Sequence, residues 1–347
     1  MKLPTAKRFC PKPFEFLEVT TDGSAWVCCE DWLPTPIGSF AEGLQEVWNS
    51  PTAQAIRASI HDGSFRYCNA DTCPSLVQQT LPTLEEVNLS LQVYLTHGAT
   101  QLEAGPKTLA LSYDNSCNLK CATCRTDYIQ LVGEEAAQAR HVHEQVVGRY
   151  LSTATNLIVT GAGDALSSRL FGTFLKTLNA ADFPDLRICI MTNGLRFTRR
   201  AWLDLESAHA AIDGVTVSVD AATAETYRLN RGGSWPKLLS NLEFLGSLVG
   251  VNELAYFEMS FVVQGNNYRE MELFVELSRS LGATVLFQKV LPWEGTLFSS
   301  PEQYGSIAIH DPLHPEHADF LRTLAAPVFG AEDVDLSNLA GYRERIA

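Results

Sequence analysis

Three cysteines lie within one short segment of the chain, Cys117-Asn-Leu-Lys-Cys121-Ala-Thr-Cys124. A cubane iron–sulfur cluster has four irons held by cysteine thiolates, and a tight loop with spacings of three and two residues can reach three of them. A structural zinc site usually takes four ligands in C-x2-C pairs, and a secreted disulfide framework contains an even number of cysteines. The triplet therefore indicates an iron–sulfur centre with one open iron, with a zinc site as the alternative.

The composition limits the partners of the protein. Lys and Arg number 26 against 40 Asp and Glu in 347 residues, a formal charge of −14, which disfavours nucleic acid or an anionic membrane as the main partner. No apolar run approaches the roughly 18 residues that span a bilayer, and no apolar signal segment follows the N-terminus. We therefore expect a soluble cytoplasmic protein, whose nine cysteines are metal ligands more often than disulfides.

From Lys107 onward, short apolar and β-branched runs alternate with helical stretches, which is the pattern of βα units around a parallel sheet. The predicted strands are Thr108–Tyr113, Asn156–Thr160, Leu186–Met191, Val215–Val219, Tyr256–Val263 and Val285–Val290. The predicted helices are Glu134–Leu151, Ser168–Leu178, Thr198–Leu205, Trp235–Leu248 and Tyr268–Leu281. We predict an α/β fold, a partial (β/α)6 TIM-like barrel preceded by a small loop-rich module. The chemistry of such barrels lies at the carboxyl ends of the strands.

The spacing C-x3-C-x2-C resembles the defining loop of the radical S-adenosylmethionine (SAM) superfamily, in which the amino and carboxylate groups of SAM chelate the open iron. Thr123 replaces the aromatic residue that usually precedes the third cysteine and packs against adenine. The resemblance implies reductive cleavage of SAM to a 5′-deoxyadenosyl radical that abstracts hydrogen from a substrate. It also implies an electron donor such as a flavodoxin or ferredoxin. A non-catalytic iron–sulfur electron carrier is the alternative of another class.

Two segments after the second and third predicted strands resemble SAM-binding segments of the family. Gly161-Ala162-Gly163-Asp164 resembles its GGE segment with Asp in place of Glu, where glycine lets the backbone approach the SAM amino group. Asn193 lies in Thr192-Asn193-Gly194, which resembles the TNG turn of the family. The resemblance implies that both segments contribute to the SAM site, although either can be a plain turn.

The last three predicted strands end in further candidates. Ser218 and Asp220, followed by Arg228 and Arg231, resemble the segment that holds the ribose or carboxylate of SAM. Arg231 is the first choice and Arg228 the second, because a guanidinium fork suits a carboxylate. The fifth and sixth strands are followed by polar or aromatic residues that could meet SAM or substrate, Gln264 and Trp293.

Residues 1–80 are rich in proline and contain little regular structure. A segment of this kind needs a cross-link, such as a bound metal centre, to be stable. Strands are predicted only at Phe16–Val19 and Ala25–Val27, and the segment contains Cys10, Cys28, Cys29, Cys68 and Cys73. The cysteine spacing resembles the SPASM auxiliary-cluster module, with Ile37-Gly38, Leu44–Trp48 and Ala55–Ile60 matching its later elements. The resemblance implies an auxiliary [4Fe–4S] cluster on Cys10, Cys28, Cys68 and Cys73, with Cys29 as an alternative to Cys28. A zinc knuckle is the alternative to the cluster.

We expect four segments: residues 1–80 as the auxiliary module, 81–106 as a linker with a helix at Leu84–Tyr94, 107–295 as the barrel and 296–347 as a C-terminal extension packing on it. No catalytic side chain is predicted, since Cys189 is expected to be a small core residue rather than a radical partner. Many SPASM relatives modify ribosomal peptides but often carry a leader-binding domain, for which these segments leave no room. The expected substrate is therefore a small polar molecule, a nucleoside or sugar in natural product biosynthesis, with a ribosomal peptide as the alternative.

Overall fold

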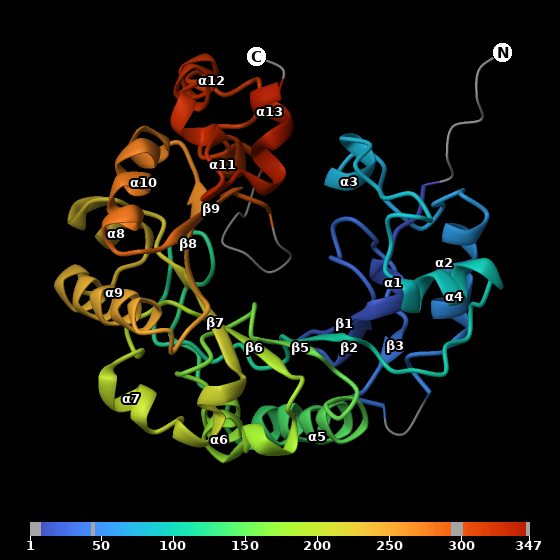
Figure 1. Ribbon diagram of the computed structural model, residues 1–347. Coiled ribbons are helices and arrows are strands. Elements are labelled where there is room, and N and C mark those ends of the chain that lie inside the picture. The colour runs from blue at the N-terminus through green and yellow to red at the C-terminus, as the bar shows by residue number, and fades with distance from the viewer. Residues whose placement is uncertain (1–7, 43–45, 293–300, 345–347) are drawn as a thin grey trace, which may run out of the picture. The chain divides into compact units, whose positions relative to one another are not determined.

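The computed structural model describes residues 8–42, 46–292 and 301–344 (Figure 1). The chain forms two compact units, each assembled from three segments. The first unit consists of Met1–Asn115, Leu131–Ala162 and Phe183–Ile188, and the second of Ser116–Gln130, Gly163–Asp182 and Cys189–Ala347. None of the helices in the described part of the chain has the length and apolar character that a membrane span requires.

The sheet of the first unit combines a hairpin with parallel strands. Its strands are β1 (Phe16–Val19), β2 (Ser24–Trp26), β3 (Gly38–Ser39), β4 (Thr108–Leu111) and β5 (Asn156–Val159). β2 pairs antiparallel with both β1 and β3, and Gly23 makes the β1–β2 turn with a φ of +83° that favours glycine. β1 also pairs in parallel with β4, which pairs in parallel with β5. The cysteine-rich N-terminal segment therefore adds a strand to the parallel sheet, a pairing that was not predicted from the sequence.

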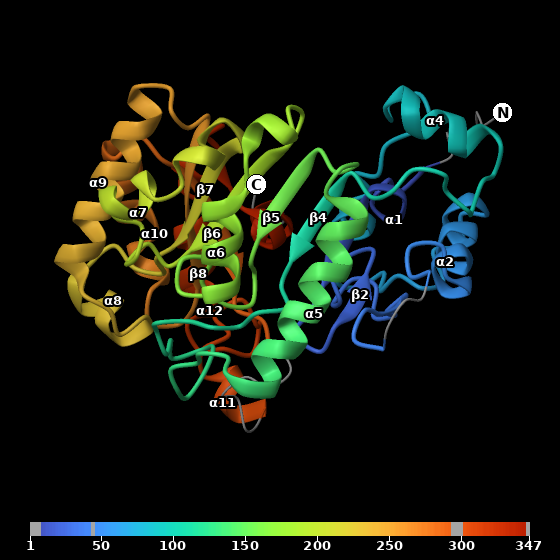
Figure 2. The same ribbon diagram turned by 90° about the horizontal axis from the view of Figure 1, so that it is seen from below.

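The helices of the first unit are α1 (Lys12–Glu15), α2 (Pro51–His61), α3 (Pro74–Val77), α4 (Leu89–Thr96) and α5 (Gly133–Tyr150). α5 runs alongside β4 and β5 (Figure 2) and buries Val142 and Val146. α4 begins later than predicted because the Asn88 side chain caps it, accepting a hydrogen bond from Leu91 N at 3.0 Å. Segment Leu44–Trp48, which resembles a short helix of the SPASM module, lies partly outside the described residues, and its described part, 46–48, is not helical.

Arg57 of α2 connects loops of this unit through hydrogen bonds. It is fully buried, and its guanidinium carbon lies 4.5 Å from the centre of the Trp48 ring. The guanidinium donates to uncharged oxygens at 2.8–3.0 Å, namely Pro13 O, Trp48 O, Thr100 O and Asn49 Oδ1. Burial lowers the pKa of Arg57 to about 10. One side chain thus satisfies four oxygens from separate parts of the unit.

Replacing Arg57 by Ala is expected to lower the free energy of unfolding by about 3 kcal/mol or more, because several buried oxygens lose their donors together. Urea unfolding followed by circular dichroism measures the change. Arg66→Ala is the matched control, since Arg66 is about half exposed and pairs with Asp62 at 3.0 Å. That surface pair contributes less than about 1 kcal/mol. Equal losses in the two variants would contradict the role of Arg57.

The second unit contains parallel strands and helices. Its strands follow the order β6 (Arg187–Thr192), β7 (Ile212–Ser218), β8 (Tyr256–Val263), β9 (Thr284–Lys289) and β10 (Val334–Asp335), and β6 begins in the first unit. β7 to β10 pair in parallel. Alternate β8 residues Phe257, Met259, Phe261 and Val263 are buried, with the Phe261 ring centre 4.8 Å from that of Phe274. These side chains form the apolar layer beneath the helices.

The helical elements of the second unit follow the strands along the chain. The α-helices are α6 (Arg169–Thr177), α7 (Arg199–Leu203), α8 (Ala224–Asn230), α9 (Trp235–Gly250), α10 (Met271–Ser280), α11 (Pro301–Gly305), α12 (His317–Leu324) and α13 (Ala340–Glu344). The 3-10 turns are η1 (Ala180–Asp182), η2 (Glu206–Ala211), η3 (Tyr268–Glu270), η4 (Pro327–Gly330) and η5 (Ser337–Leu339). From β4 to β9, six strands alternate with helices, which confirms the predicted α/β class and the partial (β/α)6 TIM-like barrel.

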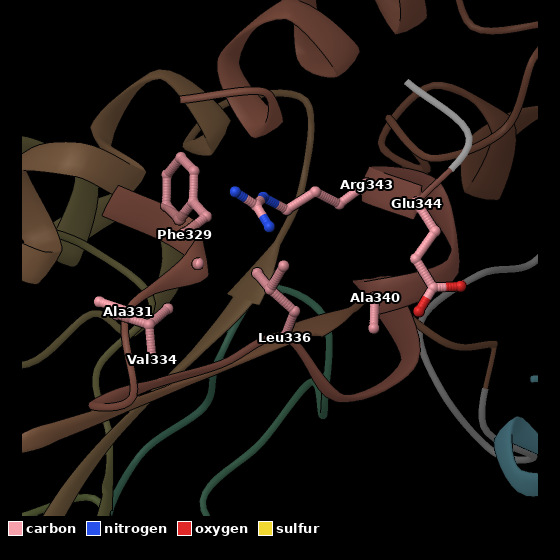
Figure 3. A pocket seen from close by; sticks show the side chains of 8 residues that line it. Phe329, Ala331, Val334, Leu336, Ala340, Arg343 and Glu344 are labelled. Atoms are coloured by element: carbon pink, nitrogen blue, oxygen red, sulfur yellow. The ribbon is translucent and has the colours of Figure 1, made fainter. Parts of the chain in front are cut away.

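A cavity of about 310 Å³ lies between η4 and α13 of the second unit (Figure 3). Its lining is mostly apolar, with Phe329 and Leu336 among its walls. Figure 3 shows the Arg343 guanidinium reaching toward Phe329, while the Glu344 carboxylate points away from it. None of the predicted site residues lines this cavity, so we place the candidate site elsewhere.

Candidate active site

Cys117, Cys121 and Cys124 lie on a single loop of the second unit. Cys117 N donates to Ile129 O at 2.8 Å, and Cys124 N donates to Cys121 O at 3.0 Å. Ala122 N donates to Asn230 O at 2.9 Å, which joins the loop to the end of α8. The backbone therefore turns tightly around the three thiols and is anchored on both sides.

Each thiol of the loop lies beside one N–H donor. The donors lie 3.3–3.7 Å from sulfur, with Asn193 Nδ2 beside Cys117, Arg231 Nη1 beside Cys121 and Arg125 Nε beside Cys124. Positive charge and N–H donors favour a thiolate, and hydrogen bonds to sulfur are a regular means of tuning iron–sulfur sites. The surroundings of the triplet therefore fit cysteine thiolates that hold a cluster.

Asp164 joins the segments around this loop. It is fully buried, and its carboxylate accepts from Ser167 Oγ at 2.8 Å, Thr192 Oγ1 at 2.7 Å and Asn193 N at 2.8 Å. Its own N–H donates to Ser116 O at 2.9 Å. Both carboxylate oxygens are thus engaged by the protein. Asp164 holds neighbouring segments in register and has little capacity left for the SAM amino group.

The other residues of the glycine-rich segment, 161–163, are divided between the two units. Gly161 and Ala162 belong to the first unit and Gly163 to the second. Ala162 N donates to Thr160 Oγ1 at 3.1 Å. A Cβ added to Gly161 would meet, among the described residues, only Ser112 Oγ at 3.5 Å. The first unit itself therefore does not require glycine at position 161.

Arg231 and Asp220 form a buried ion pair. Arg231 Nη2 lies 2.7 Å from Asp220 Oδ2, and the two side chains are 13% and 5% exposed. Burial alone would lower the pKa of Arg231, but Asp220 and then Cys121 raise it above its ordinary value. Burial raises the pKa of Asp220, and Arg231 opposes that shift. The guanidinium therefore stays charged next to the cysteine loop.

Burial and nearby hydrogen-bond donors also shift the pKa of the cysteine thiols. Burial raises the pKa of Cys121, and the guanidinium of Arg231 is the main opposing influence. Burial also raises the pKa of Cys117, which the N–H of Leu119 opposes. Cysteine binds metal as the thiolate, so cluster binding displaces protons from these side chains.

Five polar side-chain atoms of the second unit are buried without a hydrogen-bond partner among the described residues: His310 Nδ1, Arg343 Nε, Tyr227 Oη, Arg231 Nε and Gln264 Nε2. An unsatisfied buried polar group costs about 1–3 kcal/mol, and such groups commonly mark a bound ligand or water. Arg231 lies beside Cys121, and Tyr227 interacts electrostatically with both residues. Free donors beside the cysteine loop fit a polar cofactor such as SAM. Tyr227 was not predicted from the sequence.

The other predicted residues are placed as follows. Ser218 Oγ accepts from Ser260 Oγ at 3.3 Å. Arg228 is exposed on α8, three residues before the buried Arg231. Trp293 lies outside the described residues. The structure thus brings Asn193, Asp220 and Arg231 around the cysteine loop but not Arg228.

Cys189, for which the sequence predicts a place in the core, is half-buried. Its neighbours on β6, Ile188 and Ile190, are fully buried, so the side chain of Cys189 takes the opposite side of the strand. There its sulfur lies 3.7 Å from Thr216 Oγ1, which donates to Glu258 Oε1 at 3.0 Å. Burial raises the pKa of both Cys189 and Glu258. Cys189 therefore belongs to a partly polar row on β6, β7 and β8.

Four thiols of the first unit interact with one another. Cys10 interacts electrostatically with Cys68 and Cys73, and Cys28 with Cys10 and Cys68. Burial raises the pKa of Cys10 and of Cys28 to about 12 and that of Cys68 to about 11. The loops that carry them are joined where Asn69 N donates to Trp32 O at 2.8 Å. These four side chains therefore form one group.

Cys29 interacts electrostatically with Cys28, but its own main charged neighbours are acidic. After burial, which raises the pKa of its thiol, its main electrostatic partners are Asp31 and Glu18. Two acidic neighbours disfavour a thiolate at Cys29. The surroundings therefore favour Cys28 over Cys29 as a cluster ligand.

The described residues contain no group of three His, Cys, Asp or Glu side chains arranged to hold a metal ion. A zinc knuckle needs four donors at about 2.0–2.3 Å from a single ion. The thiols of a cubane cluster instead bind different irons and lie farther apart.

Two family models match the chain. The model of the radical SAM superfamily matches residues 112–277, and the SPASM model, an iron–sulfur cluster-binding domain, matches residues 10–74. The chain belongs to the radical SAM superfamily and carries a SPASM-type module ahead of the radical SAM segment. The two family matches imply SAM and [4Fe–4S] clusters as cofactors.

Several solved structures are similar to the chain. SuiB from Streptococcus suis bound to precursor peptide SuiA is 14% identical, with a TM-score of 0.41 and coverage of 68% of this chain and 52% of SuiB. The anSMEcpe structure with AdoMet and the Cp18Cys peptide is 19% identical, with a TM-score of 0.41 and coverage of 63% and 59%. TsrM from Kitasatospora setae, a radical SAM methyltransferase with cobalamin, is 17% identical, with a TM-score of 0.39 and coverage of 54% and 37%.

The chain spans about half the length of SuiB. No curated protein matches the chain. These TM-scores are too low to carry a functional conclusion.

Proposed function

We propose that the protein is a radical SAM maturase that modifies a ribosomally made peptide. The observation that carries this proposal is the loop of three cysteines, each beside an N–H donor, within a chain that matches both the radical SAM and SPASM families. When bound, the cluster and SAM supply a 5′-deoxyadenosyl radical that abstracts hydrogen from the substrate. The residues of this chain hold the cluster, orient SAM and exclude water. A flavodoxin or ferredoxin would deliver the electron.

In this proposal, Cys117, Cys121 and Cys124 hold the cluster that binds SAM. Gly163, Asn193, Ser218 and Gln264 contact SAM, and the buried Tyr227 joins them because its hydroxyl has no partner among the described residues. Asp164 and Asp220 position these contacts, since their carboxylates are engaged by the protein. Arg231, the first choice from the sequence, is kept as the cationic contact, and Arg228, the second choice, is dropped because it is exposed.

The auxiliary cluster is proposed on Cys10, Cys28, Cys68 and Cys73, whose thiols interact with one another. Four protein ligands would leave no open iron, which suits electron transfer or shaping of the substrate site. The proposed segments remain 1–80, 81–106, 107–295 and 296–347. Because β1 pairs with β4, the first of these segments is built into the same sheet as the first strand of the barrel.

A peptide is proposed as the substrate because of the SPASM match at residues 10–74, since many enzymes with this module act on peptides. The sequence analysis favoured a nucleoside or sugar. Neither family match supports such a substrate, and the argument for it depended on the absence of a leader-binding domain. We therefore do not carry it forward.

The proposal predicts a change in the mass of a peptide encoded next to the gene for this chain. Reduced protein, SAM and the synthetic peptide are incubated without oxygen, and mass spectrometry follows both the peptide and 5′-deoxyadenosine. We expect 5′-deoxyadenosine to rise in step with modified peptide, while a peptide of scrambled sequence stays unmodified. Consumption of a supplied nucleoside or sugar, with the peptide unchanged, would contradict the peptide proposal.

A further inference from the structure

Arg231 touches both a proposed cluster ligand and an acidic residue. Its Nη1 lies 3.6 Å from Cys121 Sγ, and its Nη2 lies 2.7 Å from Asp220 Oδ2. The side chain is only 13% exposed, so solvent and salt screen its charge weakly. A lasting positive charge is therefore held next to one sulfur of the cysteine loop.

The position of this charge is fixed through Asp220. Asp220 Oδ1 accepts from Val262 N at 2.7 Å, and its carbonyl accepts from Asn230 Nδ2 at 2.9 Å and Asn267 Nδ2 at 3.0 Å. Its backbone has a φ of +58°, which a non-glycine residue rarely adopts. Several contacts thus hold the carboxylate that aims the guanidinium at Cys121.

A charge in this place acts on the electron affinity of a cluster. The reduced cluster carries one more negative charge than the oxidised cluster, and hydrogen bonds to its sulfurs stabilise it more, which raises the reduction potential. Asp220 has the opposite sign, but the hydrogen bond to Cys121 Sγ, at 3.6 Å, comes from the guanidinium, whose other terminal nitrogen faces Asp220. The net effect of the pair is therefore that of the guanidinium.

We propose that Arg231 is a positioning residue that raises the reduction potential of the SAM cluster through its hydrogen bond to Cys121, with Asp220 holding it in place. The inference rests on the proposed function, because it requires a cluster on the three cysteines. Arg231 Nε is buried and has no partner among the described residues, so one donor of the same guanidinium remains for an acceptor on bound SAM. Arg231 would then connect SAM binding to cluster reduction.

The test is a redox titration of the reconstituted full chain followed by electron paramagnetic resonance. The signal of the auxiliary cluster is measured alone in the Cys117→Ala, Cys121→Ala, Cys124→Ala triple variant and subtracted. In Arg231→Gln, we expect at least a roughly tenfold lower ratio of reduced to oxidised SAM cluster at a fixed potential, about 59 mV for a one-electron couple. Arg228→Gln is the matched control, because the same residue type is exposed there, and its potential should equal that of the unmodified protein.

An Arg231→Gln protein with full iron content and an unshifted potential overturns the proposal. If that variant does not retain the cluster, Arg231→Lys takes its place, because Lys keeps the charge but lacks the fork that reaches two partners. A smaller downward shift is then expected, and an unchanged potential overturns the proposal. Formation of 5′-deoxyadenosine by the unmodified protein is measured in parallel, so that failure of the proposed function is distinguished from failure of this inference.

Discussion

Replacement of Cys117, Cys121 and Cys124 together by Ala is expected to halve the bound iron, from about eight atoms per chain to about four. The three thiols lie on one loop, each beside an N–H donor, so their loss should remove one complete cluster. Iron and acid-labile sulfide are measured after anaerobic reconstitution. The auxiliary cysteines lie in the first unit and should retain their iron.

Cys189→Ala provides the matched control for this triple substitution. Cys189 also lies in the second unit, but its sulfur contacts Thr216 and is assigned to no cluster. This variant should bind the full amount of iron. Iron content unchanged by the triple substitution, or zinc in place of iron, would contradict the assignment of the loop.

Replacement of Cys68 or Cys73 by Ala is expected to abolish substrate turnover while the SAM cluster remains. Both side chains belong to the group of interacting thiols in the first unit, and loss of one ligand should remove the auxiliary cluster. SAM cleavage without substrate modification should persist, because it requires only the cluster of the second unit. Liquid chromatography of product and 5′-deoxyadenosine separates the two activities.

Cys29→Ala is the control in the same module, since Cys29 has Asp31 and Glu18 as its main charged neighbours. It should keep both the auxiliary iron and substrate turnover. Circular dichroism verifies that each variant is folded. Full product formation by a soluble Cys68 or Cys73 variant without auxiliary iron would show that the cluster is dispensable for the reaction.

The strands of the barrel could be predicted because their signal is local. Tyr256–Val263 is predicted and observed with the same bounds, since β-branched and aromatic residues with a buried alternate set mark a strand. The parallel pairing of β1 with β4 could not be predicted in this way. It joins segments about ninety residues apart in the sequence, such as Phe16 and Thr108, and nothing in either segment specifies its partner.

Contacts between residues that are distant in the sequence could not be predicted for the site either. The cysteine triplet is visible in the sequence because its ligands are adjacent, whereas Arg231 and Cys121 meet from positions 110 residues apart. The direction of a side chain also depends on the packing of its helix, so the buried Tyr227 was missed, and Arg228 is exposed. Asp164 was predicted as a SAM contact, but its carboxylate accepts hydrogen bonds from Thr192 and Asn193, which are distant in the sequence, and has little capacity left for SAM.

The most direct test of the account is the formation of 5′-deoxyadenosine from SAM. Anaerobically reconstituted protein is reduced with dithionite in the presence of SAM, and the nucleoside is quantified by liquid chromatography and mass spectrometry. We predict that the unmodified chain forms 5′-deoxyadenosine and that the triple Cys117, Cys121 and Cys124 variant forms none. Absence of the product from unmodified protein with both clusters intact would contradict the account and favour a non-catalytic electron carrier.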